Sequence, residues 1–329
     1  MRLHEKWAED SRQMELLAVK EQLQAVLYGL AIGDALGVPV EFKSRGSFQV
    51  TGFIEGGTYN QPLGTWSDDT SLTLSLIEHL AEKSDLESLM DKFDAYRRGY
   101  LTPHGECFDI GIGTNEAIER YLSGVSPVES GGASEMDNGN GAIMRISPLA
   151  ILLQEEFDFP KKVKIIERYT KITHRHPRTI VASILYIQIL IGLLLNNNLE
   201  NTLKGTKKIF LESFDQSHPY RKEFEEYYVN LFSKEFLELP SSEIASTGYV
   251  VDTLKAVIWC VGTTDSFKSA VLKAVTLGGD TDTIGAITGT LAGALYKFES
   301  IPEEWINKIA NKSLIDEKIK EFLNYFQEL

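Results

Sequence analysis

Apolar side chains recur along this chain at the spacing of an α-helix. Leu72, Leu76 and Leu80 are spaced so that they fall on one helical face. The same period marks four longer stretches, at residues 25–36, 180–195, 251–261 and 286–295. The alternation that marks a strand is scarce, and its best example is residues 48–54. The pattern therefore predicts an all-α protein with long loops.

Glycine-rich breaks separate these stretches, and none has the composition of an interdomain linker. They fall at residues 45–46, 56–57, 111–113, 131–141 and 278–279. We expect a single domain over residues 21–329, closed by packing between segments far apart in the chain. Residues 1–20 are mostly polar and precede the first strong helical pattern. We expect them to form an N-terminal extension, either frayed or a docking helix.

Two clusters of carboxylates and hydroxyls lie far apart in the chain, each just before an apolar helical stretch. The first is Trp-Ser-Asp-Asp-Thr at 66–70, and the second is Gly-Gly-Asp-Thr-Asp-Thr at 278–283. Such oxygens are the ligands that Mg²⁺, Mn²⁺ or Ca²⁺ prefer. They also suit a helix N-cap, and for one cluster alone both interpretations stay open. The four carboxylates together favour a site for one or two divalent cations.

The composition is that of an acidic globular protein. The 329 residues are 43% hydrophobic, enough for a large core, and the net charge of −14 argues against general nucleic-acid binding. Cys107 and Cys260 make neither a disulfide framework nor a zinc site. The N-terminus has no apolar signal region, and the apolar run at 180–195 contains Ser183 and Gln188. We therefore expect a cytoplasmic protein without a membrane span.

Three carboxylates outside the clusters stand in settings that suggest a role. Asp34 lies in a helical stretch whose glycines, spaced four apart, favour tight helix packing. A carboxylate in such an apolar setting needs a partner, so we expect Asp34 to support the site. Glu41 follows Pro39 in a loop, where it could reach a substrate or remain solvated. Asp109, among glycines and apolar residues, is a candidate acid–base group or a helix N-cap.

Three further segments could contact a ligand. Residues 138–145 read as a loop leading into a helix, where free N–H groups and Arg145 could bind an anion; the alternative is a turn with an internal salt bridge. His174 and His176 have no partner cluster for zinc, so a hydrogen-bonding histidine at a site rim is favoured. Tyr249 could stack on a base or ribose, or be a core aromatic.

Taken together, these segments resemble the ADP-ribosylglycohydrolase family. Seven stretches, from residue 29 to residue 296, match in family order: GLAIGDALGVPVEF, WSDDTSLTLSLIEHL, GECFDIGIGT, GNGAIMRISPLA, THRHPRT, STGYVVDTL and GGDTDTIGAITGTLAGALY. Any one of them is weak, and the seven in order are highly specific. The resemblance implies a compact multi-helix, all-α fold with a cleft that holds two Mg²⁺ or Mn²⁺ ions.

The resemblance also implies roles for individual residues. The metal ligands would be Ser67, Asp68, Asp69, Asp280, Asp282 and Thr283. The catalytic carboxylates would be Asp109 and Glu41. The ADP-ribose pocket would be lined by segments containing Gly111, Gly113, Gly139, Asn140, Gly141, His174 and Tyr249. The family usually has threonine where this chain has Ser67, and serine keeps the oxygen. Residues 135–138 are more acidic than the family's usual small residues, which affects contacts to phosphates there.

The implied reaction is removal of ADP-ribose from a modified protein by hydrolysis of an N-glycosidic bond, most simply to arginine. The metals would orient the ribose hydroxyls, and a carboxylate would transfer protons or activate water. The extension at 1–20 suggests a second partner, an ADP-ribosyltransferase toxin that the protein neutralises. One alternative is a catalytically silent ADP-ribose binder. Another is a haloacid-dehalogenase-type phosphatase, which residues 280–283 resemble, although residues 269–277 before them read as a helix.

Overall fold

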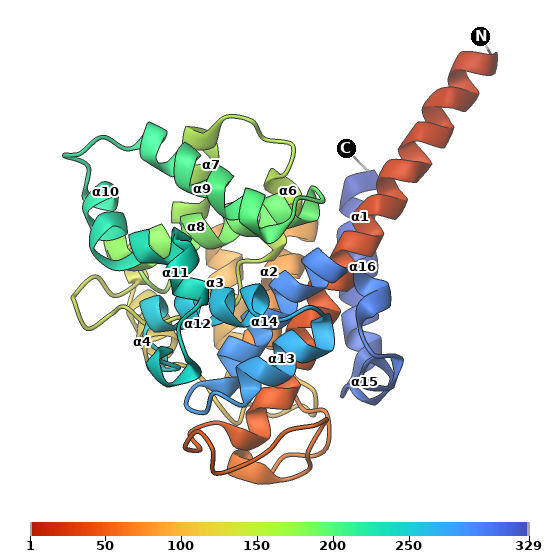
Figure 1. Ribbon diagram of the computed structural model, residues 1–329. Helices are drawn as coiled ribbons and strands as arrows, with labels where there is room; N and C mark the ends of the chain where they lie inside the picture. Colours follow the sequence, from red (N-terminus) through yellow and green to blue (C-terminus); the bar gives the residue numbers. More distant parts are fainter. Residues whose placement is uncertain (1, 328–329) are drawn as a thin grey trace.

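The computed structural model describes residues 2–327, and the side chains of residue 9 and of residues 11–327. Over that range the chain forms α-helices and short helical turns joined by loops, with isolated β-bridges and no strand (Figure 1). The all-α prediction is therefore confirmed.

Eleven helices of nine residues or more build the body. They are α1 (Arg2–Gly37), α2 (Asp68–Glu82), α3 (Leu86–Tyr96), α4 (Ile112–Leu122), α7 (Phe159–Lys171), α8 (Pro177–Leu194), α9 (Leu199–Ser213), α12 (Val250–Gly262), α13 (Phe267–Val275), α14 (Thr281–Tyr296) and α16 (Lys312–Gln327). Shorter helices are α5 (Pro127–Ser130), α6 (Pro148–Leu153), α10 (Pro219–Glu223), α11 (Lys234–Leu237) and α15 (Glu303–Lys308). Single turns are η1 (Val38–Val40), η2 (Gly57–Tyr59), η3 (Phe224–Tyr228), η4 (Val229–Phe232), η5 (Ser241–Glu243) and η6 (Phe298–Ser300). All five helical stretches predicted from apolar periodicity coincide with these helices, and only the stretch 180–195 runs one residue past its helix, α8.

The strand candidate at residues 48–54 is wrong, because this segment is an irregular loop. Its apolar side chains anchor the loop to the body instead of pairing with a neighbouring strand. Val50 is buried, and the ring of Phe53 lies 6.4 Å from that of Trp305 on α15. In this segment, the alternating apolar residues are therefore the points at which the loop attaches to the body of the protein.

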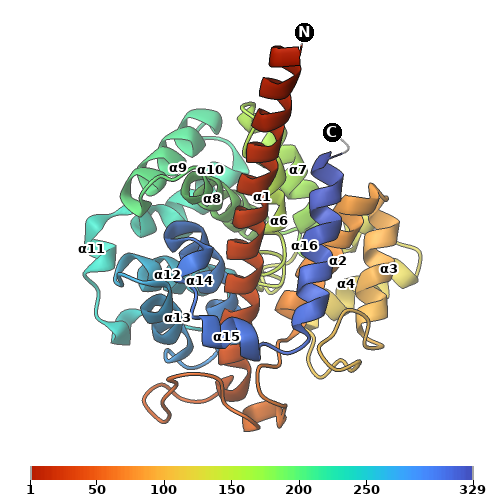
Figure 2. The ribbon, with the colours of Figure 1, turned by 90° about the vertical axis from the view of Figure 1, so that its right-hand side faces the viewer.

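Helix α1 runs through the middle of the molecule beside α14. In Figure 2 it separates α2, α3 and α4 from α8, α9, α12 and α13, with α16 alongside it. Residues 2–37 form one continuous helix, which includes most of the predicted extension. The first turns of this helix project beyond the body (Figure 2). Two helical segments, Ser11–Val40 and Pro177–Leu194, are long and apolar enough to span a membrane, but 94% and 83% of an apolar 18-residue window in each is buried inside the protein. Core helices have the same properties, so this is weak evidence for a span.

Helices α1 and α14 touch backbone to backbone through facing glycines. A Cβ atom at Gly33 would lie 2.0 Å from the carbonyl oxygen of Gly285, and one at Gly29 would lie 2.2 Å from that of Gly289. Any larger side chain would collide with backbone that cannot move aside cheaply. The predicted role of these glycines in tight helix packing is confirmed.

Substituting Gly33 with alanine should destabilise the fold, since the added methyl group meets backbone atoms of α14. We expect the free energy of unfolding to fall by about 2 kcal/mol in Gly33→Ala. The matched control is Gly205→Ala in the exposed interior of α9, where a Cβ atom has nothing within 4 Å. That variant should gain about 0.5 kcal/mol from helix propensity. Chemical denaturation measures both, and equal stability of the two variants would contradict the packing argument.

Candidate active site

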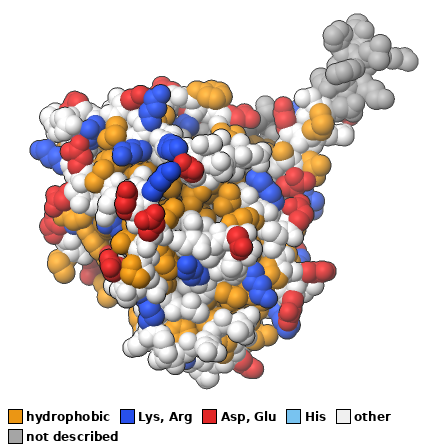
Figure 3. Space-filling model, in the orientation of Figure 1, with side chains coloured by type: hydrophobic (Ala, Val, Ile, Leu, Met, Phe, Trp, Pro, Cys, Tyr) orange, Lys and Arg blue, Asp and Glu red, His pale blue; other side chains and the backbone are white. Residues whose placement is uncertain are grey.

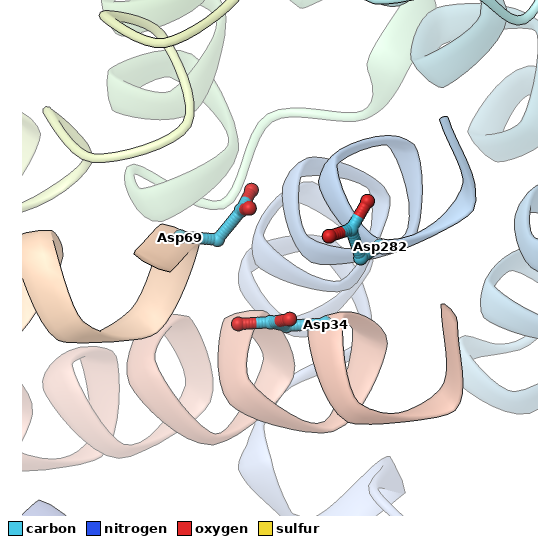
Figure 4. Close-up of side chains that lie close together, drawn as sticks. All are labelled: Asp34, Asp69 and Asp282. Carbon is cyan, nitrogen blue, oxygen red and sulfur yellow. The ribbon is translucent and has the colours of Figure 1, made fainter. Parts of the chain in front are cut away.

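Carboxylates from three helices converge at the centre of the molecule. Asp34 on α1, Asp69 in the first turn of α2 and Asp282 in the first turn of α14 have oxygens within 4.8 Å of one another (Figure 4). Glu41, Asp109 and Asp282 form a second group at the same spacing. Because Asp282 belongs to both, the two groups make one continuous acidic site, which we call the acidic centre.

Asp34 holds the start of α2 in place. Its carboxylate accepts hydrogen bonds from the backbone N–H of Ser67 (3.0 Å) and Thr70 (3.2 Å) and from the hydroxyls of both residues (2.8 and 2.6 Å). A carboxylate is stabilised at a helix N-terminus, where the first N–H groups lack partners within the helix. Burial raises the pKa of Asp34 to about 6, and these bonds oppose the rise. Its contacts are those of a supporting residue.

The two acidic clusters of the sequence meet directly. The Thr283 hydroxyl donates to Oδ2 of Asp69 at 3.1 Å, and the Ser67 hydroxyl lies 3.2 Å from the same oxygen. Asp68 accepts a bond from the backbone N–H of Gly111 at 3.0 Å. Asp280 accepts one from the side-chain amide of Asn140 at 2.6 Å. All six predicted metal-ligand residues therefore lie at or beside the acidic centre.

The acidic centre has an excess of negative charge. Burial raises the pKa values of Asp68, Asp69 and Asp282 well above the ordinary range, and neighbouring carboxylates raise them further. Burial also raises the pKa of Glu41 to about 8. In the part of the chain whose side chains are described, no lysine or arginine forms an ion pair with these groups. Such a site must take up protons or a cation.

The donor set fits a divalent cation. Oδ1 of Asp69 and Oε2 of Glu41 are buried without a hydrogen-bond partner among the described residues. Carboxylate and hydroxyl oxygens are the donors that hard ions such as Mg²⁺ and Mn²⁺ take. The acidic centre therefore has both the charge and the free oxygens to hold metal.

Tyr59 is a site residue that the sequence analysis missed. Its hydroxyl lies close enough to Glu41 and Asp109 to lower the pKa of each, although burial raises both overall. Its ring packs on Phe108 with centroids 5.1 Å apart. The residue stands in the one-turn segment η2, and a single tyrosine in a glycine-rich loop carries no signal of this contact.

Glycines line the imidazole edge of His174, and we call this place the glycine-lined pocket. A Cβ atom at Gly113 would lie 2.9 Å from Nε2 of His174, one at Gly139 would lie 3.3 Å from the same atom, and one at Gly141 would lie 2.8 Å from Cε1. A side chain at these positions would crowd the imidazole, so glycine allows the closest approach. Gly111 has a different neighbour, since its N–H binds Asp68. Three of the predicted pocket glycines thus surround the predicted histidine.

Tyr249 stands at the edge of this pocket, on the strand-like pairing between two loops. Gly139 and Tyr249 form an isolated bridge, with Asn140 N–H donating to Gly248 at 3.0 Å and Val250 N–H donating to Asn138 at 2.9 Å. The Tyr249 side chain is partly exposed, and its hydroxyl accepts a bond from Arg178 at 3.2 Å. It is therefore a rim residue, as the ligand-contact interpretation requires.

Arg145 is not an anion ligand, and this prediction is wrong. Its guanidinium is fully buried and donates to the Tyr169 carbonyl (3.0 Å) and the Thr173 hydroxyl (2.7 Å). The alternative of an internal salt bridge also fails, because both partners are neutral. The N–H groups of Met144 and Arg145 are used within turns, and α6 begins only at Pro148. This segment therefore presents no helix N-terminus to a ligand.

The acidic residues at 135–138 are tied to the protein. Glu135 pairs with Arg178 at 2.9 Å, and Asp137 accepts bonds from the N–H and hydroxyl of Ser134.

The two histidines do not face a common metal. His176 accepts a hydrogen bond from the N–H of Arg178, while His174 forms a hydrogen bond with Thr173. Cys107 and Cys260 are free thiols, as expected.

Comparison with known proteins places the chain in one family. A sequence model of the family described as ADP-ribosylglycohydrolase matches residues 16–328. ADP-ribosylarginine hydrolase Tri1 of Serratia proteamaculans is 33% identical over 304 residues, which cover 90% of this chain and 77% of that protein. ADP-ribosyl-dinitrogen reductase glycohydrolase of Rhodospirillum rubrum is 31% identical over 305 residues, which cover 90% and 92%.

A solved structure agrees with these sequence matches. A chain of an ADP-ribosylglycohydrolase-related protein complex superposes with a TM-score of 0.75 and 29% identity, covering 94% of this chain and 98% of its own. Matches of this length and identity show that the chain belongs to the ADP-ribosylglycohydrolase family and is a glycosyl hydrolase.

Proposed function

We propose that this protein hydrolyses the N-glycosidic bond between ADP-ribose and an arginine side chain of a modified protein, with two Mg²⁺ or Mn²⁺ ions in the acidic centre. The observation that carries the proposal is the meeting of the two acidic clusters through Asp69 and Thr283. The relatives named as an ADP-ribosylarginine hydrolase and as a dinitrogen-reductase glycohydrolase support the choice of an ADP-ribosylated protein as substrate.

The side chains have distinct tasks in this reaction. Asp68, Asp69, Asp280 and Asp282, with the hydroxyls of Ser67 and Thr283, would hold the ions. When bound, divalent cations orient and polarise hydroxyl oxygens of a substrate. Glu41 and Asp109 lie in the group shared with Asp282, where either carboxylate can move a proton at the ribose. His174, its surrounding glycines and Tyr249 would bind the rest of ADP-ribose.

The phosphatase alternative has lost its structural basis. A haloacid-dehalogenase motif should follow a buried strand, whereas residues 280–283 follow helix α13 and start helix α14. The alternative of a catalytically silent ADP-ribose binder differs from the proposal in turnover, because a silent binder releases no ADP-ribose.

Free thiols and the absence of a disulfide in the described residues support our proposal of a cytoplasmic location.

We also propose that the projecting part of α1 contacts a protein partner, namely an ADP-ribosyltransferase whose product this enzyme removes. Met14 and Leu17, in the N-terminal half of α1, are 67% and 54% exposed. On the face shown in Figure 3, acidic and basic side chains are interspersed, with no continuous basic surface that would suit a nucleic acid. An exposed helical end with apolar residues is better suited to a protein surface.

Asp282 should be essential for turnover. Free ADP-ribose released from an arginine-ADP-ribosylated protein is measured with Mg²⁺ or Mn²⁺ and again with EDTA. We expect metal-dependent release, and a loss above about 100-fold in Asp282→Ala, since removing even a residue behind a metal ligand costs about 10–100-fold. Glu299→Ala, an exposed acid far from the centre, is the control. Activity within a few-fold of wild type in Asp282→Ala would sink the ligand assignment; tight ADP-ribose binding without any release would support the silent binder.

Metal-free protein should lose stability as the pH rises. Glu41 has a pKa of about 8 in the folded protein against an ordinary value of 4.5, so between these values the folded state holds a proton that the unfolded state has released. The stabilisation that this proton provides is complete below the pKa of the unfolded state, 4.5. It is lost as the pH rises through the pKa of the folded state, about 8. Thermal unfolding in EDTA should show a melting temperature that falls across this range, and Mg²⁺ should oppose the fall. Glu41→Gln should flatten the profile in EDTA, and an unchanged slope would contradict the assignment.

The partner proposal predicts that changes to the projecting helix affect binding and spare catalysis. The double variant Met14→Glu with Leu17→Glu should weaken capture of the ADP-ribosyltransferase in a pull-down and leave ADP-ribose release unchanged. Leu122→Glu, at a similarly exposed position on α4, is the matched control. Capture that survives both the double substitution and deletion of residues 1–20 would remove the idea.

A further inference from the structure

A chain of hydrogen bonds leads from a buried arginine to the floor of the glycine-lined pocket. Nη2 of Arg145 donates to Oγ1 of Thr173 at 2.7 Å, and that oxygen lies 2.9 Å from Nδ1 of His174. All three side chains are buried. At the far end, Nε2 of His174 faces Gly113 and Gly139 and has no hydrogen-bond partner among the described residues. Nε2 is therefore the ring nitrogen of His174 that remains available to a ligand.

The chemistry of the three groups favours one arrangement of protons in this chain, the one in which the hydroxyl proton of Thr173 has an acceptor. Arginine has donors only, so the bond from Arg145 must end on a lone pair of Thr173. A hydroxyl has one proton, and the acceptor available to it among the described residues is Nδ1 of His174. A neutral imidazole that accepts at Nδ1 carries its proton on Nε2. The proton of His174 is therefore directed into the pocket.

Arg145 is held so that it cannot take another role. It also donates to the Tyr169 carbonyl near the end of α7, where a cation is favoured, and its guanidinium lies 5.0 Å from the ring centroid of Phe93. Its Nε and Nη1 atoms are buried without partners among the described residues. Among the described residues, the hydroxyl that accepts a bond from Arg145 is that of Thr173.

We propose that Arg145, acting through Thr173, is a positioning residue that keeps His174 as the neutral Nε2–H tautomer, a hydrogen-bond donor to an acceptor oxygen of the bound nucleotide diphosphate sugar. The proposal rests on the proposed function, because it assumes that ADP-ribose occupies the pocket. Burial and the nearby Arg145 charge also lower the pKa of His174 to about 3, which keeps the ring uncharged at neutral pH. Recognition then depends on a directed N–H group, and the ligand needs an acceptor at that place.

Thr173→Val tests the relay with little change of shape, because valine replaces the hydroxyl by a methyl group. Thr173→Ser restores the hydroxyl and is the matched control. Nitrogen-15 spectra of histidine-labelled protein report which ring nitrogen carries the proton, and the His174 signal is assigned by its loss in His174→Gln. Calorimetry gives the Kd for ADP-ribose in each variant. Thermal unfolding checks that the variants remain folded.

The relay predicts protonation at Nε2 in the wild type and in Thr173→Ser. In Thr173→Val we expect a mixture of tautomers and a Kd for ADP-ribose raised about tenfold, with Thr173→Ser close to wild type. Protonation at Nδ1 in the wild type would overturn the proposal, and this measurement does not depend on any variant folding. An unchanged tautomer and Kd in Thr173→Val would also overturn it. If the wild type binds no ADP-ribose, the proposed function fails, while the spectra still decide the relay.

Discussion

The backbone contact between α1 and α14 is the constraint on which the rest of the structure depends. Because Gly33 meets Gly285 without side chains between them, the two helices have one register and one separation. Asp34 follows Gly33, and Asp282 stands one turn before Gly285, so the same contact brings these two carboxylates together. Asp34 then positions the first turn of α2, which carries Asp68 and Asp69. The acidic centre is thus a result of helix packing at glycine.

This packing also explains how the protein tolerates so much buried negative charge. Neighbouring carboxylates oppose one another, and only a rigid frame of large buried surface keeps them in place. The hydroxyls of Ser67, Thr70 and Thr283 satisfy some of the oxygens and leave others free. The frame therefore holds a site that is unfavourable by itself and suited to a cation.

Sequence analysis predicted what depends on local pattern or residue type. Apolar periodicity located five of the longer helices, and the oxygen-rich clusters located the acidic centre, because each property belongs to a short segment. Contacts between segments far apart in the chain could not be predicted from the sequence. Residues 48–54 alternate like a strand but anchor a loop, and Arg145 has the type of an anion ligand but lies buried behind Thr173. Tyr59 reaches Glu41 only because of the way the loop after η1 folds back, which no local pattern encodes.

The long separation between the glycine partners has a consequence for biosynthesis. Chains are made from the N-terminus, and α1 leaves the ribosome long before α14, whose residues 281–296 supply its partner surface. Until then the face of α1 that carries Gly29 and Gly33 lacks its final neighbour and stays in contact with water. In a nascent chain, helix α1 must therefore be shielded by another molecule or remain unfolded until α14 has been made. Any fragment that stops before α14 carries one cluster only, so the complete acidic centre forms only in chains that have been almost completely translated.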